Sequence, residues 1–312
     1  MDINDKIFVA GHRGLVGSAI VEQLQTSGYK NIITKNRIEL DLSNQLQVEK
    51  FFEEYRPDYV FDAAARVGGI YANNTYPAEF IYENLMIQNN LIHNSWKYGV
   101  KKFLFMGSVC IYPKYAETPV KEESLLTGLL ESTNEAYAIA KIAGIKMCEA
   151  YYKQYGFPCV SVMPCNLFGP NDNFDINNGH VIPAMIHKFS DASSGPITLW
   201  GDGSPRREFL YSSDMADACI FLMNHIDVGN AELINIGSGN DITIKDLAEI
   251  LLKVTGFKGG LIWDKSRPNG TPKRNLDSTR LNNLGWHKKT DFEKALTNTY
   301  HWYLNNEKNK VF

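Results

Sequence analysis

The sequence predicts an α/β protein built on a doubly wound parallel sheet. Over residues 6–167, short apolar runs alternate with amphipathic runs, as expected for strands joined by crossover helices. The first apolar run leads into glycines at 11, 14 and 17, which open an amphipathic run as in Rossmann-type nucleotide folds. After residue 167 this alternation stops. We therefore expect a Rossmann-type doubly wound parallel sheet with a smaller, mixed C-terminal domain.

The first half supplies the strands and helices of this sheet. Five apolar runs are predicted to be strands: Lys6–Ala10, Asn31–Thr34, Tyr59–Ala63, Lys102–Gly107 and Cys159–Met163. The intervening amphipathic runs are predicted to be helices: Gly14–Ser27, Ser43–Tyr55, Pro77–Tyr98 and Tyr137–Tyr155. The third strand ends in small residues, which would let a ligand approach the backbone.

The second half is less regular. We expect loop at 169–173, a strand and turn at 195–203, a strand at 234–237 and a helix at 246–255. Ser212 or Ser213 is predicted to cap a further helix. The predicted domains are 1–167, to which 212–238 returns, and a second one made of 168–211 and 239–312.

Composition and charge exclude several function classes. The chain has 312 residues, with 32 basic and 35 acidic, which gives no electrostatic argument for nucleic acid or an anionic membrane. We find neither a signal peptide at the N-terminus nor an apolar run near the roughly 20 residues that span a bilayer. Five cysteines without a Cys-x-x-Cys pair favour reduced thiols and a cytoplasmic protein. No metal site is expected.

The glycine-rich turn is the candidate phosphate site. Gly11 would permit the tight turn, Gly14 the close approach of a pyrophosphate, and Gly17 helix–strand packing. Helix N-terminal amides would then face the phosphates. The Gly-x-x-Gly-x-x-Gly spacing is weak by itself, since a glycine turn without a ligand has the same sequence.

The end of the second strand indicates which nicotinamide dinucleotide is used. An acidic residue usually binds the ribose 2′-hydroxyl of NAD there. Here the strand is followed by Lys35, Asn36 and Arg37, and Arg13 lies in the glycine loop. Cations favour a 2′-phosphate, so NADP(H) is predicted. The alternative is that Lys35 and Arg37 are solvated surface charges.

Ser108, Tyr137 and Lys141 are the candidate catalytic residues. Tyr137 and Lys141 are four apart on a predicted helix and therefore share a face. Tyr137 would donate a proton to a carbonyl oxygen, Lys141 would supply positive charge and hold the nicotinamide ribose, and Ser108 would hydrogen-bond the developing alkoxide. Together with the glycine turn, in this order, they predict hydride transfer to or from a carbonyl.

Cys110 and His180 are candidates for a second activity. Cys110 lies two residues beyond Ser108, and His180 precedes a helical run from a loop. A thiol and an imidazole next to a ketone are suited to exchanging protons at the adjacent carbons. From spacing alone, a buried apolar cysteine and an ordinary loop histidine are the favoured interpretation.

The assembled motifs resemble the extended short-chain dehydrogenase/reductases, and within them the GDP-L-fucose synthase family, over nearly the whole chain. The segments that carry the resemblance are 11–20, 67–77, 110–113, 134–144, 180–184 and 207–210. Members of that family use NADPH to epimerise C3 and C5 of GDP-4-keto-6-deoxy-mannose and then to reduce C4.

The resemblance implies roles for individual residues. Ser108, Tyr137 and Lys141 would reduce the ketone, and Cys110 and His180 would epimerise its neighbouring carbons. The cofactor-binding residues would be Gly11, His12, Arg13, Gly14, Leu15, Val16, Gly17, Arg37, Asp41, Leu42, Ala64, Lys141, Pro164, Asn166, Leu167 and His180. The substrate-binding residues would be Ser108, Cys110, Lys188, Trp200, Arg207 and Asp277. Residues 1–167 would then bind NADP, the second domain would bind the GDP-sugar, and the enzyme would be a homodimer.

Two positions depart from the family pattern. Lys188 stands where the family usually has Arg, and Arg66 stands where it has Lys. Lys does not reproduce a bidentate Arg contact. An alternative is therefore a C4-reductase without epimerase activity, acting on a related GDP-4-keto sugar such as a GDP-6-deoxy-4-keto-heptose in polysaccharide biosynthesis.

Overall fold

A parallel six-stranded sheet forms the larger part of the protein. The computed structural model describes residues 1–176, 179–191, 195–225, 228–267, 269 and 272–308. The strand order is β2-β1-β3-β4-β5-β9, and every pairing is parallel. The strands are β1 (Lys6–Ala10), β2 (Asn31–Ile33), β3 (Tyr59–Asp62), β4 (Lys102–Met106), β5 (Cys159–Pro164) and β9 (Asn230–Ile236). This confirms the predicted α/β fold.

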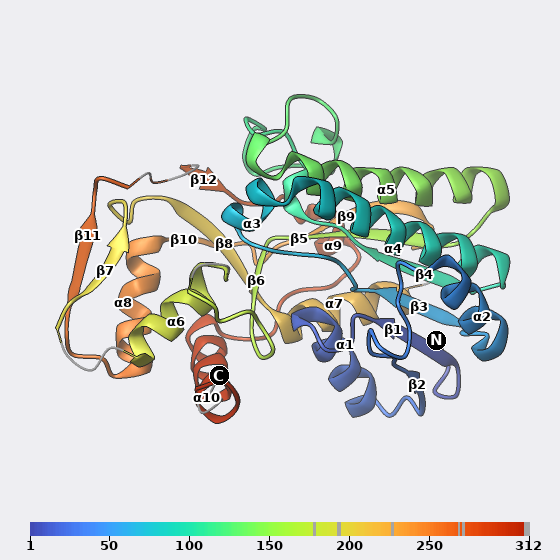
Figure 1. Cartoon of the computed structure of the whole chain (residues 1–312), viewed down its shortest axis with the longest axis horizontal. Coiled ribbons are helices and arrows are strands. Elements are labelled where there is room, and N and C mark those ends of the chain that lie inside the picture. Colours follow the sequence, from blue (N-terminus) through green and yellow to red (C-terminus); the bar gives the residue numbers. More distant parts are fainter. Residues whose placement is uncertain (177–178, 192–194, 226–227, 268, 270–271, 309–312) are drawn as a thin grey trace.

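Helices cover both faces of the sheet (Figure 1). One face carries α1 (Leu15–Thr26) and α7 (Ser212–Asn224), which pack against each other. The other carries α4 (Pro77–Lys97) and α5 (Glu135–Tyr155), with α2 (Gln45–Tyr55) beside α4. Buried strands with near-continuous apolar sequences, such as Phe103, Leu104 and Phe105 in β4, fit a sheet covered on both sides.

Most of the remaining strands and longer helices gather at one end of the molecule, on the left in Figure 1. A small mixed sheet joins β6 (Asn166–Phe168), β8 (Arg206–Tyr211), β10 (Asp241–Thr243) and β12 (Lys273–Arg274), and a parallel pair joins β7 (Ile197–Trp200) and β11 (Leu261–Asp264). The helices here are α6 (Val181–Asp191), α8 (Ile244–Thr255) and α10 (Phe292–Asn306). Their apolar faces form a second core, separate from that of the large sheet.

Short helices complete the fold. They are α3 (Ile70–Thr75), α9 (Thr279–Asn283) and the 3₁₀ turns η1 (Val109–Ile111), η2 (Glu122–Ser124) and η3 (Ser132–Asn134). Among the described residues, no helix is long and apolar enough to cross a membrane.

One capping prediction was wrong. The N-cap of α7 is Tyr211, which makes no side-chain capping bond, and Ser212 already lies inside the helix with a 2% exposed side chain. Because β8 runs directly into α7, the strand rather than a capping serine determines where the helix begins.

Candidate active site

The candidate residues meet at the carboxyl edge of the large sheet. Gly11 follows β1, Ala64 follows β3, Ser108 follows β4, and Pro164 ends β5. Because parallel strands place their carboxyl ends at one edge, residues far apart in sequence line a common site.

The glycine turn is shaped for an anionic ligand. Gly11 has a φ of 78°, and a Cβ there would lie 2.6 Å from the Ala63 oxygen; a Cβ on Gly17 would lie 2.2 Å from the Gly11 oxygen. Gly14 is different, because its nearest neighbour would be 3.5 Å away. It is the N-cap of α1 and no side chain caps that helix, so the first amides remain available to a pyrophosphate. These residues fit a dinucleotide.

Cations stand near this turn, as a 2′-phosphate requires. Arg13 is exposed in the turn itself, and Arg37 is exposed after β2. Asp41 also lies here, but it accepts hydrogen bonds from the backbone N–H and hydroxyl of Ser43 at 3.0 and 2.7 Å, which hold its pKa below the usual value. Lys35 does not join them, because its ammonium lies over the ring of Tyr55.

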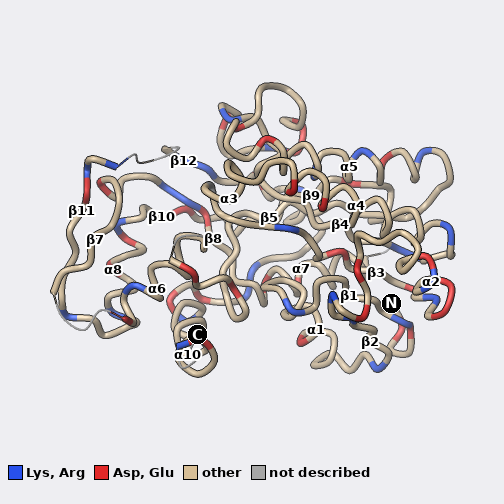
Figure 2. The backbone as a smooth tube through the Cα atoms, in the orientation of Figure 1, with Lys and Arg blue, Asp and Glu red and all other residues tan. Residues whose placement is uncertain are grey.

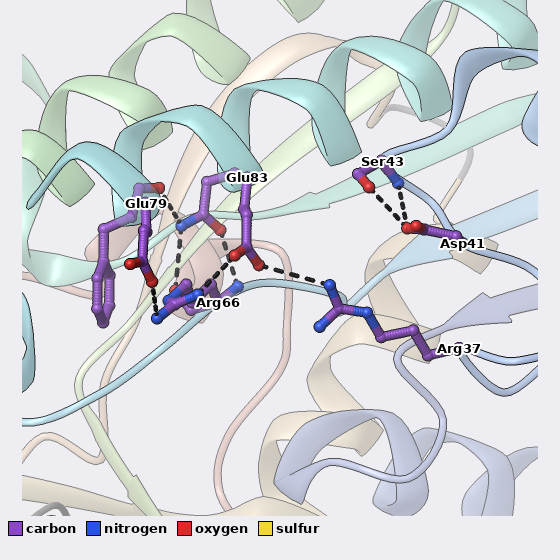
Figure 3. A network of polar contacts seen from close by, with 8 residues as sticks. Arg37, Asp41, Ser43, Arg66, Glu79 and Glu83 are labelled. Carbon is purple, nitrogen blue, oxygen red and sulfur yellow. Dashed lines mark hydrogen bonds and ion pairs between the residues drawn. The ribbon is translucent and has the colours of Figure 1, made fainter. Parts of the chain in front are cut away.

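Arg66 is the centre of a polar network beside the cofactor candidates (Figure 3). Its guanidinium contacts Glu79 and Glu83 at 2.5 Å each, and Glu83 also lies 3.9 Å from Arg37. Asn84 fixes the Arg66 backbone, accepting its N–H and donating to its carbonyl, both at 3.0 Å. Arg66, which stands where the family has Lys, therefore binds two carboxylates at once, and the planar guanidinium is suited to this.

Tyr137 and Lys141 lie on one face of α5, as predicted. The Lys141 ammonium donates to the Met106 carbonyl at 2.8 Å and lies 6.0 Å from the centroid of the Tyr137 ring. Lys141 is only 2% exposed. This contact places the ammonium at the end of β4, and Ser108 lies two residues beyond Met106.

Burial controls the ionisation of these side chains. It raises the pKa of Tyr137 well above the usual value, although interaction with Ser108 opposes this rise. Burial likewise lowers the pKa of Lys141, while the negative charge of Asp62 opposes that change. Tyr137 therefore keeps its phenolic proton at neutral pH, as a proton donor must.

Cys110 belongs to the same group of side chains. It is in η1, directly after β4, with its side chain buried and its N–H 3.5 Å from the Ser108 hydroxyl oxygen. Burial raises the pKa of Cys110 to about 11, while Ser108, Lys141 and Arg274 favour the thiolate and oppose that rise. At neutral pH the thiol is thus protonated, with cations placed to stabilise its anion.

His180 precedes α6 and remains exposed. Although part of its surface is exposed, the surrounding protein atoms displace enough water to lower its pKa below the usual value. None of the hydrogen bonds of the described residues joins His180 to Cys110. Of these two residues, Cys110 is the one that interacts with Tyr137.

The other predicted substrate residues lie on the C-terminal part of the chain. Arg207 in β8 is partly buried and is paired with Arg274 in β12. Burial lowers the pKa of both guanidinium groups, and the charge of Arg274 lowers that of Arg207 further. Trp200 is 64% exposed, with the Arg267 guanidinium 5.1 Å from its ring.

Two further candidates lie on separate elements of this part of the chain. Lys188 lies near the end of α6. The Asp277 carboxylate accepts the Thr279 N–H at 2.8 Å, and this interaction lowers its pKa.

Arg274 is a candidate that the sequence did not single out. Its guanidinium donates to the carbonyls of Tyr112 and Pro113 at 3.1 and 3.3 Å, which ties β12 to the loop after Cys110. A second half-buried guanidinium next to Arg207 suits a diphosphate. The only signal in the sequence is a Lys-Arg pair in a polar segment, which resembles ordinary surface charge.

The geometry defines a class of protein: a Rossmann-fold oxidoreductase that acts on a carbonyl compound with a nicotinamide dinucleotide. Residues 7–237 match the NAD dependent epimerase/dehydratase family, and the chain belongs to that family.

The relatives within this family are similar over nearly their full length. GDP-L-fucose synthase 1 of Arabidopsis thaliana is 54% identical, covering 99% of this chain and 96% of the relative. GDP-L-fucose synthase of Escherichia coli (strain K12) is 49% identical, covering 97% of each. Among solved structures, the GDP-mannoheptose C4 reductase MlghC from Campylobacter jejuni, with NADP bound, is 40% identical with a TM-score of 0.89, covering 97% of this chain and 99% of that one.

Proposed function

We propose that this enzyme converts GDP-4-keto-6-deoxy-mannose to GDP-L-fucose with NADPH, by epimerisation at C3 and C5 and reduction at C4. The observation that carries the proposal is the interaction of Cys110 with Ser108, Tyr137 and Lys141. A reductase needs the last three residues, whereas an acid–base thiol next to the ketone is suited to epimerisation. The sequence identity of 54% and 49% to two GDP-L-fucose synthases supports the same activity.

In the reduction step, NADPH supplies the hydride that adds to C4. Tyr137 gives its phenolic proton to the C4 oxygen, and the Ser108 hydroxyl donates a hydrogen bond to that oxygen as negative charge develops. The Lys141 ammonium stabilises this charge and holds the nicotinamide ribose. The enclosure of Lys141 and Tyr137 strengthens these interactions because little water screens them.

For cofactor binding, the turn of residues 11–17 receives the pyrophosphate, and Arg13 and Arg37 bind the 2′-phosphate. His12, Asp41, Leu42 and Ala64 border the adenosine half. The nicotinamide half is bordered by Lys141, Pro164, Asn166, Leu167 and His180.

In the epimerisation step, Cys110 and His180 act as base and acid. One group removes the proton from C3 or C5, which the adjacent ketone acidifies, and the other returns a proton to the opposite face. The electron pair is held meanwhile on the C4 oxygen, where Ser108 and Tyr137 donate hydrogen bonds. In this mechanism the sugar lies between Cys110 and His180, which fits the absence of a hydrogen bond between the two among the described residues.

The GDP moiety binds across the C-terminal elements. Arg207 pairs with the diphosphate, to which we add Arg274. Trp200 stacks near the base, and Lys188 and Asp277 complete the contacts. This assigns residues 1–167 and 212–238 to NADP and residues 168–211 and 239–312 to the GDP-sugar.

A second candidate function is C4 reduction alone, on a related GDP-4-keto sugar with a longer carbon chain. The exposed position of His180 favours it, as does the similarity to a C4 reductase of a GDP-heptose. In this case Lys188 and Arg66 would alter how the sugar is placed.

One experiment separates these functions. The enzyme is given GDP-4-keto-6-deoxy-mannose and NADPH in deuterated water, and NMR reports product configuration and deuterium content. Deuterium at C3 and C5 of a GDP-L-fucose product supports the epimerase–reductase. Reduction at C4 without deuterium at either carbon leaves the C4-reductase, and no reduction of any GDP-4-keto sugar excludes both.

Two further properties complete the proposal. We propose a cytoplasmic enzyme, because all five cysteines are buried free thiols. We also propose a homodimer, because Tyr82 on α4 and Ile139 on α5 expose 63% and 44% of their side chains on adjacent helices. Light scattering coupled to size exclusion measures the subunit number.

A further inference from the structure

Asp62 is a fully enclosed carboxylate for which the proposed mechanism has no task. It ends β3, and its side chain is 0% exposed. One oxygen accepts the Ala64 N–H at 3.2 Å, while the other has no hydrogen-bond partner among the described residues. Enclosing a carboxylate with an unpaired oxygen is costly, so a compensating charge is expected nearby.

The sheet register places Lys141 beside this carboxylate. Asp62 is paired with Phe105 on the neighbouring strand β4, so their side chains leave the same face of the sheet. The Lys141 ammonium lies 4.8 Å from the centroid of the Phe105 ring. The carboxylate and the ammonium therefore flank one aromatic ring, both enclosed between the sheet and α5.

The two groups favour each other's charged form. Burial raises the pKa of Asp62 to about 6, and Lys141 opposes this rise. Burial lowers the pKa of Lys141, and among the influences that raise it Asp62 ranks before Cys110. At neutral and alkaline pH Asp62 is thus ionised, with its negative charge available to Lys141.

Little else near Asp62 carries charge. On α5, Tyr137 and Cys148 also experience its field, which raises the pKa of both. The neighbouring strand β1 is apolar where it pairs with the end of β3, at Val9 and Ala10. On α4, the buried polar side chains are neutral: Asn84, Gln88, Asn90, Asn94 and Ser95. Among the described residues, Lys141 is thus the positively charged side chain that acts on Asp62.

We propose that Asp62 is a positioning residue for the reductase chemistry, whose enclosed negative charge keeps the Lys141 side chain as an ammonium between Met106 and Phe105. This inference rests on the proposed reductase function. Without Asp62, burial would favour neutral Lys141, which would neither stabilise the C4 oxygen nor hold the ribose as a cation.

The pH dependence of the reaction tests this proposal. Removal of the Asp62 charge lowers the pKa of both Lys141 and Tyr137, and the active enzyme needs both groups protonated. In Asp62→Asn, the alkaline limb of the kcat profile should therefore move to lower pH, by about one to two units, the size expected when one enclosed neighbouring charge is removed. The pH dependence of NADPH affinity, measured by fluorescence, should move in the same direction.

Ser161→Ala is the matched control. Ser161 is paired with Phe105 from the other side, and its buried hydroxyl also has no hydrogen-bond partner among the described residues. Its replacement changes the same layer of the sheet without changing charge, so its pH profile should superpose on that of the wild type. Equal shifts in both variants would indicate a packing effect and overturn the proposal.

Two further outcomes are decisive. An Asp62→Asn profile that superposes on that of the wild type overturns the proposal while leaving the reductase function intact. If the Asp62→Asn variant does not fold, the Asp62→Leu variant is used instead, because a leucine side chain suits the surrounding apolar layer. If the wild type reduces no GDP-4-keto sugar, the proposed function fails, and the NADPH-affinity profile still tests the Asp62–Lys141 pair by itself.

Discussion

Arg37 and Glu83 lie 3.9 Å apart, so a carboxylate of α4 stands next to a cation proposed to bind the 2′-phosphate (Figure 3). The same carboxylate contacts Arg66 at 2.5 Å. A bound 2′-phosphate must therefore share Arg37 with the Glu83 carboxylate or displace that carboxylate. In Figure 2, acidic and basic residues are interspersed along the backbone, so we expect local pairs of this kind, rather than the overall charge, to influence phosphate binding.

Glu83→Gln should tighten NADPH binding. The change removes a negative charge near the 2′-phosphate, so the KM for NADPH should fall by about two- to fivefold at low salt, the range expected of an exposed pair. The KM for NADH should not change. Glu79→Gln is the control, because Glu79 contacts Arg66 without a described contact to Arg37. An equal change for both cofactors would contradict this prediction.

Arg37→Ala should raise the KM for NADPH at least tenfold more than the KM for NADH. Tenfold corresponds to about 1.4 kcal/mol, within the range of a charge-assisted hydrogen bond. Lys35→Ala serves as the control, because Lys35 lies over Tyr55 and should leave both values near those of the wild type. Steady-state kinetics with each cofactor measures the two ratios; parallel losses with NADPH and NADH would refute the assignment of Arg37.

Gly14→Ala and Gly17→Ala should separate binding from folding. A Cβ on Gly17 would lie 2.2 Å from the Gly11 oxygen, so this variant should lose roughly 1–3 kcal/mol of stability or more. Gly14 has space for a Cβ and a φ of −80°, so its variant should melt near the wild type. It should nevertheless bind NADPH more weakly, because a methyl group would obstruct the pyrophosphate. Calorimetric melting and cofactor titration give both quantities.

Tyr137→Phe should lose about 10²–10⁴-fold in kcat, the usual contribution of general acid catalysis. NADPH affinity and thermal stability should stay near the wild type, because the ring still packs against Phe80, whose centroid is 6.3 Å away. Deuterium exchange at C3 and C5 should continue at a reduced rate, because Ser108 still donates a hydrogen bond to the C4 oxygen. Near-native turnover would mean that another group donates the proton.

Deuterium exchange without NADPH should accelerate as pH rises. The pKa of Cys110 is raised to about 11, so below that value each pH unit increases the reactive thiolate about tenfold. The rate between pH 7 and 9, followed by NMR with the keto sugar alone, should rise accordingly. Cys110→Ser should nearly abolish exchange while still reducing a pre-epimerised ketone. A rate independent of pH would show that Cys110, with the pKa that it has in the absence of substrate, is not the base.

Much of the site follows from local pattern. The strand ends at Ala10, Asp62 and Met106 were predicted to within one residue, because apolar runs bounded by glycine or small polar residues mark buried parallel strands. Since such strands share a carboxyl edge, the turn at Gly11 and the hydroxyl of Ser108 were expected to meet there. The spacing of Tyr137 and Lys141 placed both on one face of α5 without further information.

The C-terminal elements were harder to predict. The short strands β6, β10 and β12 have two or three residues each and carry almost no periodic signal. They form because β8 offers partners on both edges, which is a tertiary circumstance. The same holds for α3, whose six residues follow two glycines and are too few for a helical pattern.

The sequence by itself determined the fold class, the glycine turn and the Ser108, Tyr137 and Lys141 set, because each depends on periodicity or on short spacing along one element. Only the tertiary structure decided that Arg274 reaches the loop after Cys110, that Glu83 joins Arg37 to Arg66, and that Asp62 faces the layer of Lys141. In these cases the partners lie on different elements, and the packing of those elements sets their distances. Charge in particular acts through space rather than along the chain, so burial and neighbours, and not residue type, fix the ionisation of this site.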